Sequence, residues 1–179
     1  MIAIQRFSTE NLHHLYELLA KKDKDLKAIT SEYGYPPVWI RPNSFETLVL
    51  TILEQQVSLA SAYSAYKKLK ERIQLSPENL LQLTDEELRA CYLSRQKIIY
   101  TRELANAIMS KKISLKKFEE LPDDIIRKEL KALKGIGDWT VDIYLLHALR
   151  RTDVFPIGDL ALVNAIKMVK QLPSISRDE

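Results

Sequence analysis

Apolar residues recur at helical spacing through most of the chain. In the stretch after Ser44 they fall at i, i+3, i+4, i+7 and i+8, which is the pattern of one buried helix face. These residues are Phe45, Leu48, Val49, Ile52 and Leu53. The pattern resets around residues 55–58, and a second face follows at Ala62, Ala65, Tyr66, Leu69 and Ile73. We find no run of alternating apolar and polar residues between turn signals, so the patterning predicts an all-α fold.

Residues that favour helix starts divide this pattern into short helices. The predicted starts lie at Ser8, Ser44, Ser76-Pro77, Thr84, Ser94 and Pro122-Asp123. Ser and Thr side chains accept hydrogen bonds from the free amides of a first helical turn, and residues 84–87 form a capping box. The helix that starts at Pro122 is predicted to end at Gly135, and a new one to begin near Asp138.

Composition and charge narrow the function only slightly. The 179 residues suffice for one sizeable core or for two small helical lobes. The net charge of +3 permits nucleic-acid binding without arguing for it. The single cysteine, Cys91, excludes an internal disulfide or a four-cysteine metal site and is interpreted as a buried apolar residue. With neither a secretory signal nor a membrane-length apolar run, we expect a cytoplasmic protein with no membrane partner.

The segment from Leu133 to Asp138 predicts a tight turn between two helices. Two glycines, Gly135 and Gly137, flank one apolar residue. Glycine allows positive φ and, because it has no side chain, leaves the backbone amides accessible. The amides of the turn and of the next helix would then face outward and form an anion site suited to a DNA phosphate. The alternative is an ordinary helix–turn–helix with glycine at the C-cap.

Asp159 directly precedes a predicted helix with apolar periodicity. That helix contains Leu160, Val163, Ile166 and Val169, so Asp159 is placed at the N-cap. The helix macrodipole favours the charged form of a carboxylate in this position. The alternative is that Asp159 caps the helix and has no further role.

Taken together, these two segments resemble the helix-hairpin-helix (HhH-GPD) DNA glycosylase superfamily. The matching residues are Leu-x-Gly-Ile-Gly-x-Trp-Thr, which begins at Leu133, and Asp-Val-Phe-Pro-x-x-Asp-Leu-Ala-Leu, which places Asp159 22 positions after Gly137. Two further blocks match, at residues 52–58 and 93–97. The closest branch that the chain resembles is 3-methyladenine DNA glycosylase II, and the resemblance covers residues from about 36 to 169.

The resemblance implies roles for the hairpin and for Asp159. Asp159 would be the catalytic carboxylate, and Gly135 and Gly137 would hold a DNA phosphate. Lys134 is a candidate phosphate contact, with a solvated lysine as the alternative. The backbone carbonyls of Leu133, Ile136 and Lys131 would bind a sodium or potassium ion that bridges to the phosphate, and no other cofactor is required.

The resemblance also implies a base pocket and a wedge. Trp139 would form an aromatic wall of the pocket, with Tyr144 and Trp39 as weaker candidates for which a core position is the alternative. Lyase-type relatives carry a Schiff-base lysine where this chain has Trp139, so we expect no covalent elimination step. Gln55 and Gln56 would lie at the turn that enters the duplex and fills the gap left by an extruded base. The alternative for Gln56 is a solvated turn residue.

These residue types suit base excision. Breaking an N-glycosidic bond builds positive charge on the sugar, and an ionised carboxylate stabilises that charge. An alkylated purine is already positively charged and leaves easily, so the pocket must recognise an electron-poor ring. An indole face does so by stacking and cation–π attraction. The expected function is therefore release of alkylated bases, 3-methyladenine above all, from flipped nucleotides.

We expect residues 1–179 to form a single glycosylase unit with two helical lobes and a cleft between them. One lobe would comprise residues 44–149 and include the hairpin, and the other would combine residues 1–43 with 150–179. The chain stops soon after the helix that follows Asp159, where relatives continue with further helices. The second lobe is therefore expected to be C-terminally truncated relative to that family.

The expected partner is double-stranded DNA that contains a damaged base, bound by a monomer in the cytoplasm and, in a bacterium, at the nucleoid. Two alternatives stay open. The first is a helix-hairpin-helix module that binds DNA without catalysis, because part of the family's length is missing. The second is a monofunctional glycosylase for an oxidised or mismatched base. Release of free base from DNA distinguishes the enzymes from the binding module.

Overall fold

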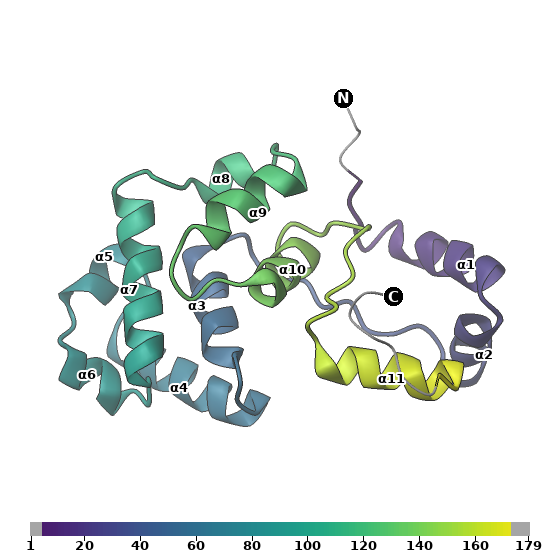
Figure 1. Cartoon of the computed structure of the whole chain (residues 1–179), viewed down its shortest axis with the longest axis horizontal. Coiled ribbons are helices and arrows are strands. Elements are labelled where there is room, and N and C mark those ends of the chain that lie inside the picture. Colours follow the sequence, from purple (N-terminus) through teal and green to yellow (C-terminus); the bar gives the residue numbers. More distant parts are fainter. Residues whose placement is uncertain (1–4, 173–179) are drawn as a thin grey trace.

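The computed structural model describes residues 5–172 and confirms the all-α class. Within this range the chain forms eleven helices and one isolated antiparallel bridge between Arg6 and Arg151. In chain order the helices are α1 (Leu12–Lys22), α2 (Lys24–Tyr33), α3 (Phe45–Glu54), α4 (Leu59–Arg72), α5 (Pro77–Gln82), α6 (Asp85–Ala90), α7 (Arg95–Met109), α8 (Leu115–Phe118), α9 (Asp123–Lys131), α10 (Asp138–His147) and α11 (Leu160–Lys170). Figure 1 shows α3 to α9 on one side, α10 near the centre, and α1, α2 and α11 on the other side.

The predicted capping residues account for most of the helix starts. The hydroxyl groups of Ser44, Ser76 and Ser94 each accept a hydrogen bond from the amide three residues later. Thr84 and Glu87 form the expected capping box, in which each side chain accepts from the backbone amide of the other residue. These local bonds satisfy donors that a helix start leaves without partners, so the sequence alone fixes where these helices begin.

The structure differs from the predicted helix map in four places. α1 begins at Leu12, because Ser8 and Asn11 exchange hydrogen bonds in a turn that precedes the helix. The pattern did not predict α2 or α8. Asp23 caps α2 by accepting from the amides of Asp25 and Leu26, and this signal was present in the sequence. α9 ends at Lys131, before the predicted end at Gly135.

The main hydrophobic core is built by α3 to α10 from buried residues that run from Phe45 to Leu149. Helix α3 lies at its centre: seven of its ten residues are buried, and it packs against α4, α7 and α10. Cys91 is buried in this core, as expected. The core therefore fixes the position of α3 and α10, whose ends carry four of the predicted site residues: Gln55, Gln56, Gly137 and Trp139.

Helices α1, α2 and α11 gather around a much smaller interior. Leu12 is the one buried residue among the described residues of these three helices. Charge holds α11 to the start of α2: the Lys170 ammonium pairs with the carboxylates of Asp23 and Asp25, at 2.8 Å from Asp25 Oδ2. We propose that these helices and the segments that join them form the second lobe, predicted for residues 1–43 and 150–179. Residues 1–4 and 173–179 of that prediction lie outside the described part of the chain.

Backbone bonds join the two helical groups. The amide of Phe7 donates to the carbonyl of Arg150 at 2.9 Å, and the amide of Arg41 donates to the carbonyl of His147 at 3.0 Å. Arg151 is buried, and its guanidinium donates to the carbonyls of Phe118 and Leu121. The segment that leaves α10 toward Asp159 is thereby held against both the main core and the N-terminal segment.

We predict that Lys170→Met loosens α11 at neutral pH. Hydrogen bonding to Lys170 lowers the pKa of Asp23, and the same contact raises the pKa of Lys170. The Asp23 contribution to stability is present above its unfolded pKa and is lost as pH falls through the lowered value. The Lys170 contribution is lost only as pH rises through the raised value, so the ion pairs are complete near pH 7. The measurement is amide hydrogen exchange of α11, which should become faster in the variant.

Lys167→Met is the matched control for this prediction. Lys167 also lies in the last turn of α11 and makes no ion pair among the residues that the structure describes. Its replacement should leave the exchange of α11 unchanged. Equal acceleration in both variants would show that lysine loss in general, and not the contact with α2, loosens the helix.

Candidate DNA-binding and catalytic site

Gly135 is fixed as glycine by the backbone and by a neighbour. Its φ is +87°, in the left-handed region that residues with a Cβ rarely adopt. A Cβ built on Gly135 would lie 2.0 Å from Cγ of Tyr100, a residue of α7. The hairpin between α9 and α10 therefore rests directly on the Tyr100 ring, and no other residue type fits at position 135.

Neither the backbone nor the packing requires glycine at position 137. Its φ is −105° and its ψ is −177°, which is extended backbone that any residue adopts, so the expected positive φ is wrong for this glycine. A Cβ at this position would meet nothing within 4 Å. Gly137 is the N-cap of α10, and the first turn of that helix receives no side-chain cap. The amides that follow Gly137 are therefore left open toward an anion.

Charged residues around this helix start largely compensate one another. Asp138, the first residue of α10, pairs with the Lys131 ammonium at 2.6 Å. This pairing offsets the repulsion that Asp138 would exert on an anion at the helix N-terminus. Lys134 lies on the turn and is exposed. The hairpin thus presents open amides with a cationic side chain close by in sequence.

The three backbone carbonyls predicted to bind a cation have free acceptor capacity. The carbonyl of Leu133 accepts the Ile136 amide at 3.2 Å, which leaves one of its two lone pairs. The carbonyls of Lys131 and Ile136 accept no backbone hydrogen bond among the described residues. Carbonyl oxygens are suitable ligands for hard cations such as sodium and potassium. The donor set therefore fits the predicted ion. The described residues contain no group of three or more His, Cys, Asp or Glu side chains placed to hold a metal.

Asp159 lies at the N-cap of α11, as predicted. Its Oδ1 atom accepts hydrogen bonds from the amides of Ala161 at 3.0 Å and Leu162 at 3.1 Å. Its Oδ2 atom makes no hydrogen bond to the described residues, and the side chain is partly exposed. One carboxylate oxygen is thus held by the helix start, while the other is free to face a substrate.

Trp139 lies beside the segment that carries Asp159. A Cβ built on Gly158 would lie 3.2 Å from Cβ of Trp139, so a side chain at the position just before Asp159 would crowd the Trp139 residue. Trp139 is the second residue of α10 and is partly buried. The structure therefore places the residue before the predicted carboxylate beside Trp139, the predicted aromatic wall in the first turn of α10, about 20 residues away in sequence.

The two weaker candidates for the base pocket, Tyr144 and Trp39, differ in burial, and no contact in the described part of the chain links either of them to Asp159. The prediction for Tyr144 is wrong: the side chain is fully buried in the main core, its hydroxyl donates to Oδ1 of Asn43, and its ring meets Phe118 edge to face. Burial raises the pKa of the Tyr144 hydroxyl far above its ordinary value. Trp39 is 66% exposed, and its carbonyl contacts Nδ1 of His147 at the far end of α10 from Trp139. No contact places Trp39 beside Asp159.

The two glutamines at the end of α3, both predicted to enter the duplex, have different surroundings. The side-chain amide of Gln55 donates to the carbonyl of Gly135 at 2.9 Å and to Oγ1 of Thr140 at 2.8 Å. Both donors are thus engaged within the protein, so we narrow the wedge prediction to Gln56. Gln56 is exposed and has a left-handed φ of +56°, at the tip of the turn between α3 and α4.

Sequence reasoning missed the residues that brace this turn. Arg41 forms a bidentate ion pair with Glu54, with distances of 2.8 and 2.7 Å. The Lys97 ammonium donates to the carbonyl of Leu53 at 2.5 Å, and burial lowers the pKa of this lysine. These partners lie 13 and 44 residues from the groups that they bind. No local pattern marks them, although Lys97 lies in one of the blocks that carries the family resemblance.

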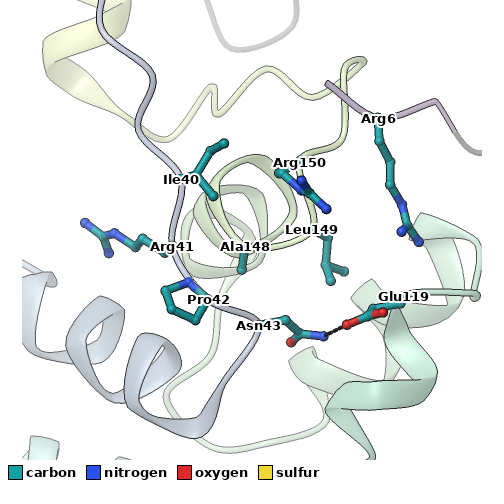
Figure 2. Close-up of a pocket in the computed structure, with 9 residues that line it drawn as sticks. All are labelled: Arg6, Ile40, Arg41, Pro42, Asn43, Glu119, Ala148, Leu149 and Arg150. Atoms are coloured by element: carbon teal, nitrogen blue, oxygen red, sulfur yellow. Dashed lines mark hydrogen bonds between the residues drawn. The ribbon is translucent and has the colours of Figure 1, made fainter. Parts of the chain in front are cut away.

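A cavity of about 240 Å³ lies elsewhere, where the N-terminal segment and the segment after α2 meet the end of α10. Figure 2 shows Arg6, Arg150 and Glu119 around it, with the amide of Asn43 bonded to Glu119. None of the predicted site residues lines this cavity. None of the described helices is long and apolar enough to span a bilayer.

Comparisons with known proteins identify the family of the chain. Residues 49–179 match the model of the HhH-GPD superfamily of base excision DNA repair proteins, and the chain belongs to that superfamily. The chain is 32% identical over 136 residues to DNA-3-methyladenine glycosylase 1 of Schizosaccharomyces pombe, a match that covers 73% of the chain and 60% of the relative. It is 30% identical over 181 residues to a DNA-3-methyladenine glycosylase of Bacillus subtilis, with 93% and 59% covered. The chain thus spans about three fifths of the length of these curated relatives.

Solved structures share the fold over most of the chain. The 3-methyladenine DNA glycosylase of Schizosaccharomyces pombe, in complex with abasic DNA, superposes with a TM-score of 0.84 at 27% identity and covers 91% of this chain and 83% of its own. A DNA-3-methyladenine glycosidase from Bacillus halodurans gives a TM-score of 0.76 at 28% identity, with 92% and 76% covered. The arrangement of the helices is therefore that of known HhH-GPD proteins.

Proposed function

We propose that this protein is a monofunctional DNA N-glycosylase that releases alkylated bases of the 3-methyladenine type. The observation that carries the proposal is the position of Asp159, a carboxylate with one free oxygen, directly after Gly158, which packs beside Trp139 in the first, uncapped turn of α10. Two curated relatives support it, since both are named DNA-3-methyladenine glycosylases and they match 73% and 93% of the chain.

The proposed partner is double-stranded DNA. The uncapped amides at the start of α10 would bind a backbone phosphate beside the lesion, with Lys134 as a further cationic contact. The carbonyls of Lys131, Leu133 and Ile136 would hold a sodium or potassium ion, which supplies positive charge against the same phosphate. Solved relatives in complex with DNA support this choice of partner.

The damaged nucleotide would then leave the base stack. Gln56, exposed on a braced turn, would enter the gap and support the opened duplex. The extruded base would stack on Trp139, where the electron-rich indole favours a cationic alkylated ring. This attraction adds selectivity for bases that already carry positive charge.

Hydrolysis would follow at the sugar carbon. The bond between C1′ and the base nitrogen breaks, and its electron pair neutralises the cationic ring. The free oxygen of Asp159 stabilises the positive charge that develops on the sugar. A water molecule adds its oxygen to C1′ and loses a proton to the carboxylate. Because Trp139 replaces the lysine of lyase-type relatives, the product would be an intact strand with an abasic site.

A panel of duplexes, each with a single modified base, tests the function. We expect release of free 3-methyladenine, and strand cleavage only after alkali treatment. Release of an oxidised or mismatched base alone would keep the enzyme class and change the substrate. Binding of duplex DNA with no release of any base would identify a non-catalytic helix-hairpin-helix module, whose affinity falls with salt according to a few phosphate contacts.

The monomeric state, the cytoplasmic location and the absence of a membrane partner stay predictions. They rest on composition and on the proposed function, which requires access to genomic DNA. Size-exclusion chromatography with light scattering would test the monomer, and a second species at twice the mass would contradict it.

A further inference from the structure

Among the residues that the structure describes, Gln55 is the one side chain that joins by hydrogen bonds the two turns proposed to touch DNA. It directly precedes Gln56 at the end of α3, and its amide reaches the α9–α10 hairpin 80 residues further along the chain. A side-chain amide has two N–H donors. One is donated to the Gly135 carbonyl inside the hairpin and the other to the Thr140 hydroxyl in the first turn of α10.

The two hydrogen bonds of Gln55 fix the position of the α3 end relative to the hairpin. Gly135 carries the left-handed backbone of the hairpin, and Thr140 is buried beneath the helix start that presents the open amides. Gln56, the next residue, is exposed with a left-handed backbone of its own. A shift of the α3 end relative to the hairpin would therefore move the wedge relative to the phosphate site.

The other braces of the same turn do not reach the hairpin. Lys97 binds the Leu53 carbonyl and Arg41 binds Glu54, so both hold the α3 end to its own surroundings. Gln55 alone among these residues connects the α3 end to the backbone of the phosphate site. Lys97 therefore serves as a control: its loss would loosen the α3 end alone, whereas loss of Gln55 would also release the α3 end from the hairpin.

We propose that Gln55 is a positioning residue that holds the wedge turn and the hairpin in register, so that gripping the phosphate and filling the gap in the duplex occur as one coupled event. This deepens the proposed glycosylase function and rests on it. Gln55 touches neither base nor sugar in this role. Its effect passes through the backbone of Gly135 and the side chain of Thr140 on one side, and through Gln56 on the other.

The test measures binding preference, which needs no chemistry. Affinity is compared between an undamaged duplex and the same duplex with a tetrahydrofuran abasic analogue, at one fixed salt concentration. Gln55→Ala should lower the preference for the abasic duplex about tenfold, the size expected from losing ordinary hydrogen bonds of this kind. Affinity for the undamaged duplex should change much less, because the amides at the start of α10 remain.

Three further variants decide between coupling and simple structural support. Gln56→Ala should also lower the preference, and the double variant of Gln55 and Gln56 should be no worse than the more affected single variant, because one needs the other. Lys97→Met should keep the preference. Additive losses in the double variant, or a loss in Lys97→Met equal to that in Gln55→Ala, would overturn the proposal. If Gln55→Ala does not fold, Thr140→Val removes one of the two acceptors and tests the same coupling.

The two proposals fail in different ways. If the wild-type protein releases no base from any duplex of the lesion panel, the glycosylase function is wrong. If it releases bases and prefers the abasic duplex, but Gln55→Ala keeps that preference, the function stands and the positioning role of Gln55 is wrong.

Discussion

Asp159→Asn should leave the protein folded and bound to DNA while lowering base release by at least about a hundredfold. Asparagine caps helices as well as aspartate does, and its side-chain oxygen can keep the hydrogen bonds from the amides of Ala161 and Leu162. The substitution therefore removes the negative charge and little else. Without that charge, the positive sugar of the transition state loses its stabilising partner.

The measurement is single-turnover release of 3-methyladenine with enzyme in excess, together with thermal unfolding and duplex affinity. Asp153→Asn is the matched control, because Asp153 is an exposed carboxylate of the same loop and lies six residues earlier. It should retain the wild-type rate. If Asp159→Asn releases base as fast as wild type, Asp159 is only a helix cap and the catalytic assignment is wrong.

The second large effect is expected from Gly135→Ala, which should lower the free energy of unfolding by about 2–5 kcal/mol. A left-handed backbone costs a residue with a Cβ about 1–2 kcal/mol, and forcing a methyl group into a packed site adds about 1–3 kcal/mol. Here the methyl group would lie 2.0 Å from the Tyr100 ring. Urea unfolding measures the loss, and duplex affinity should fall because the hairpin must shift to relieve the clash.

Gly137→Ala separates this steric effect from general loss of glycine. Position 137 has an extended backbone and open space around its Cα, so its stability should change by less than about 0.5 kcal/mol. Combining Gly135→Ala with Tyr100→Ala should recover part of the loss, since the ring is gone while the backbone strain stays. Equal stability of Gly135→Ala and the wild-type protein would contradict the packing described for the hairpin.

The sequence predicted what depends on neighbours along the chain. Ser44, Thr84, Ser94 and Asp159 cap helices through bonds to amides two or three residues away. Such bonds are visible as short patterns, and the glycine motif of the hairpin is equally local. Helix α2 was missed although Asp23 caps it, because its apolar residues leave no buried face that a periodic pattern would mark.

What the sequence did not predict depends on residues brought together by the core. Tyr144 was a weaker candidate for the base pocket, with a core position as the alternative. It lies five residues after Trp139, about 140° further round α10, and its buried ring packs onto Phe118. The resemblance assigned Gln55 and Gln56 together to the turn that enters the duplex, but Gln55 has an extended backbone at the end of α3 and Gln56 a left-handed one. The partners of Gln55 lie 80 and 85 residues away, beyond any local signal.

The ion pairs between Lys170 and α2 join residues that are nearly 150 positions apart. During synthesis on a ribosome, the contiguous stretch from Phe45 to Leu149 can fold as soon as it emerges, and it already contains the hairpin and both glutamines. The ion pairs that hold the start of α2 to α11 can form only after α11, the last of the described helices, has emerged. In a nascent chain, the turn proposed to bind phosphate would therefore be complete before the carboxylate proposed to act on the sugar is in place.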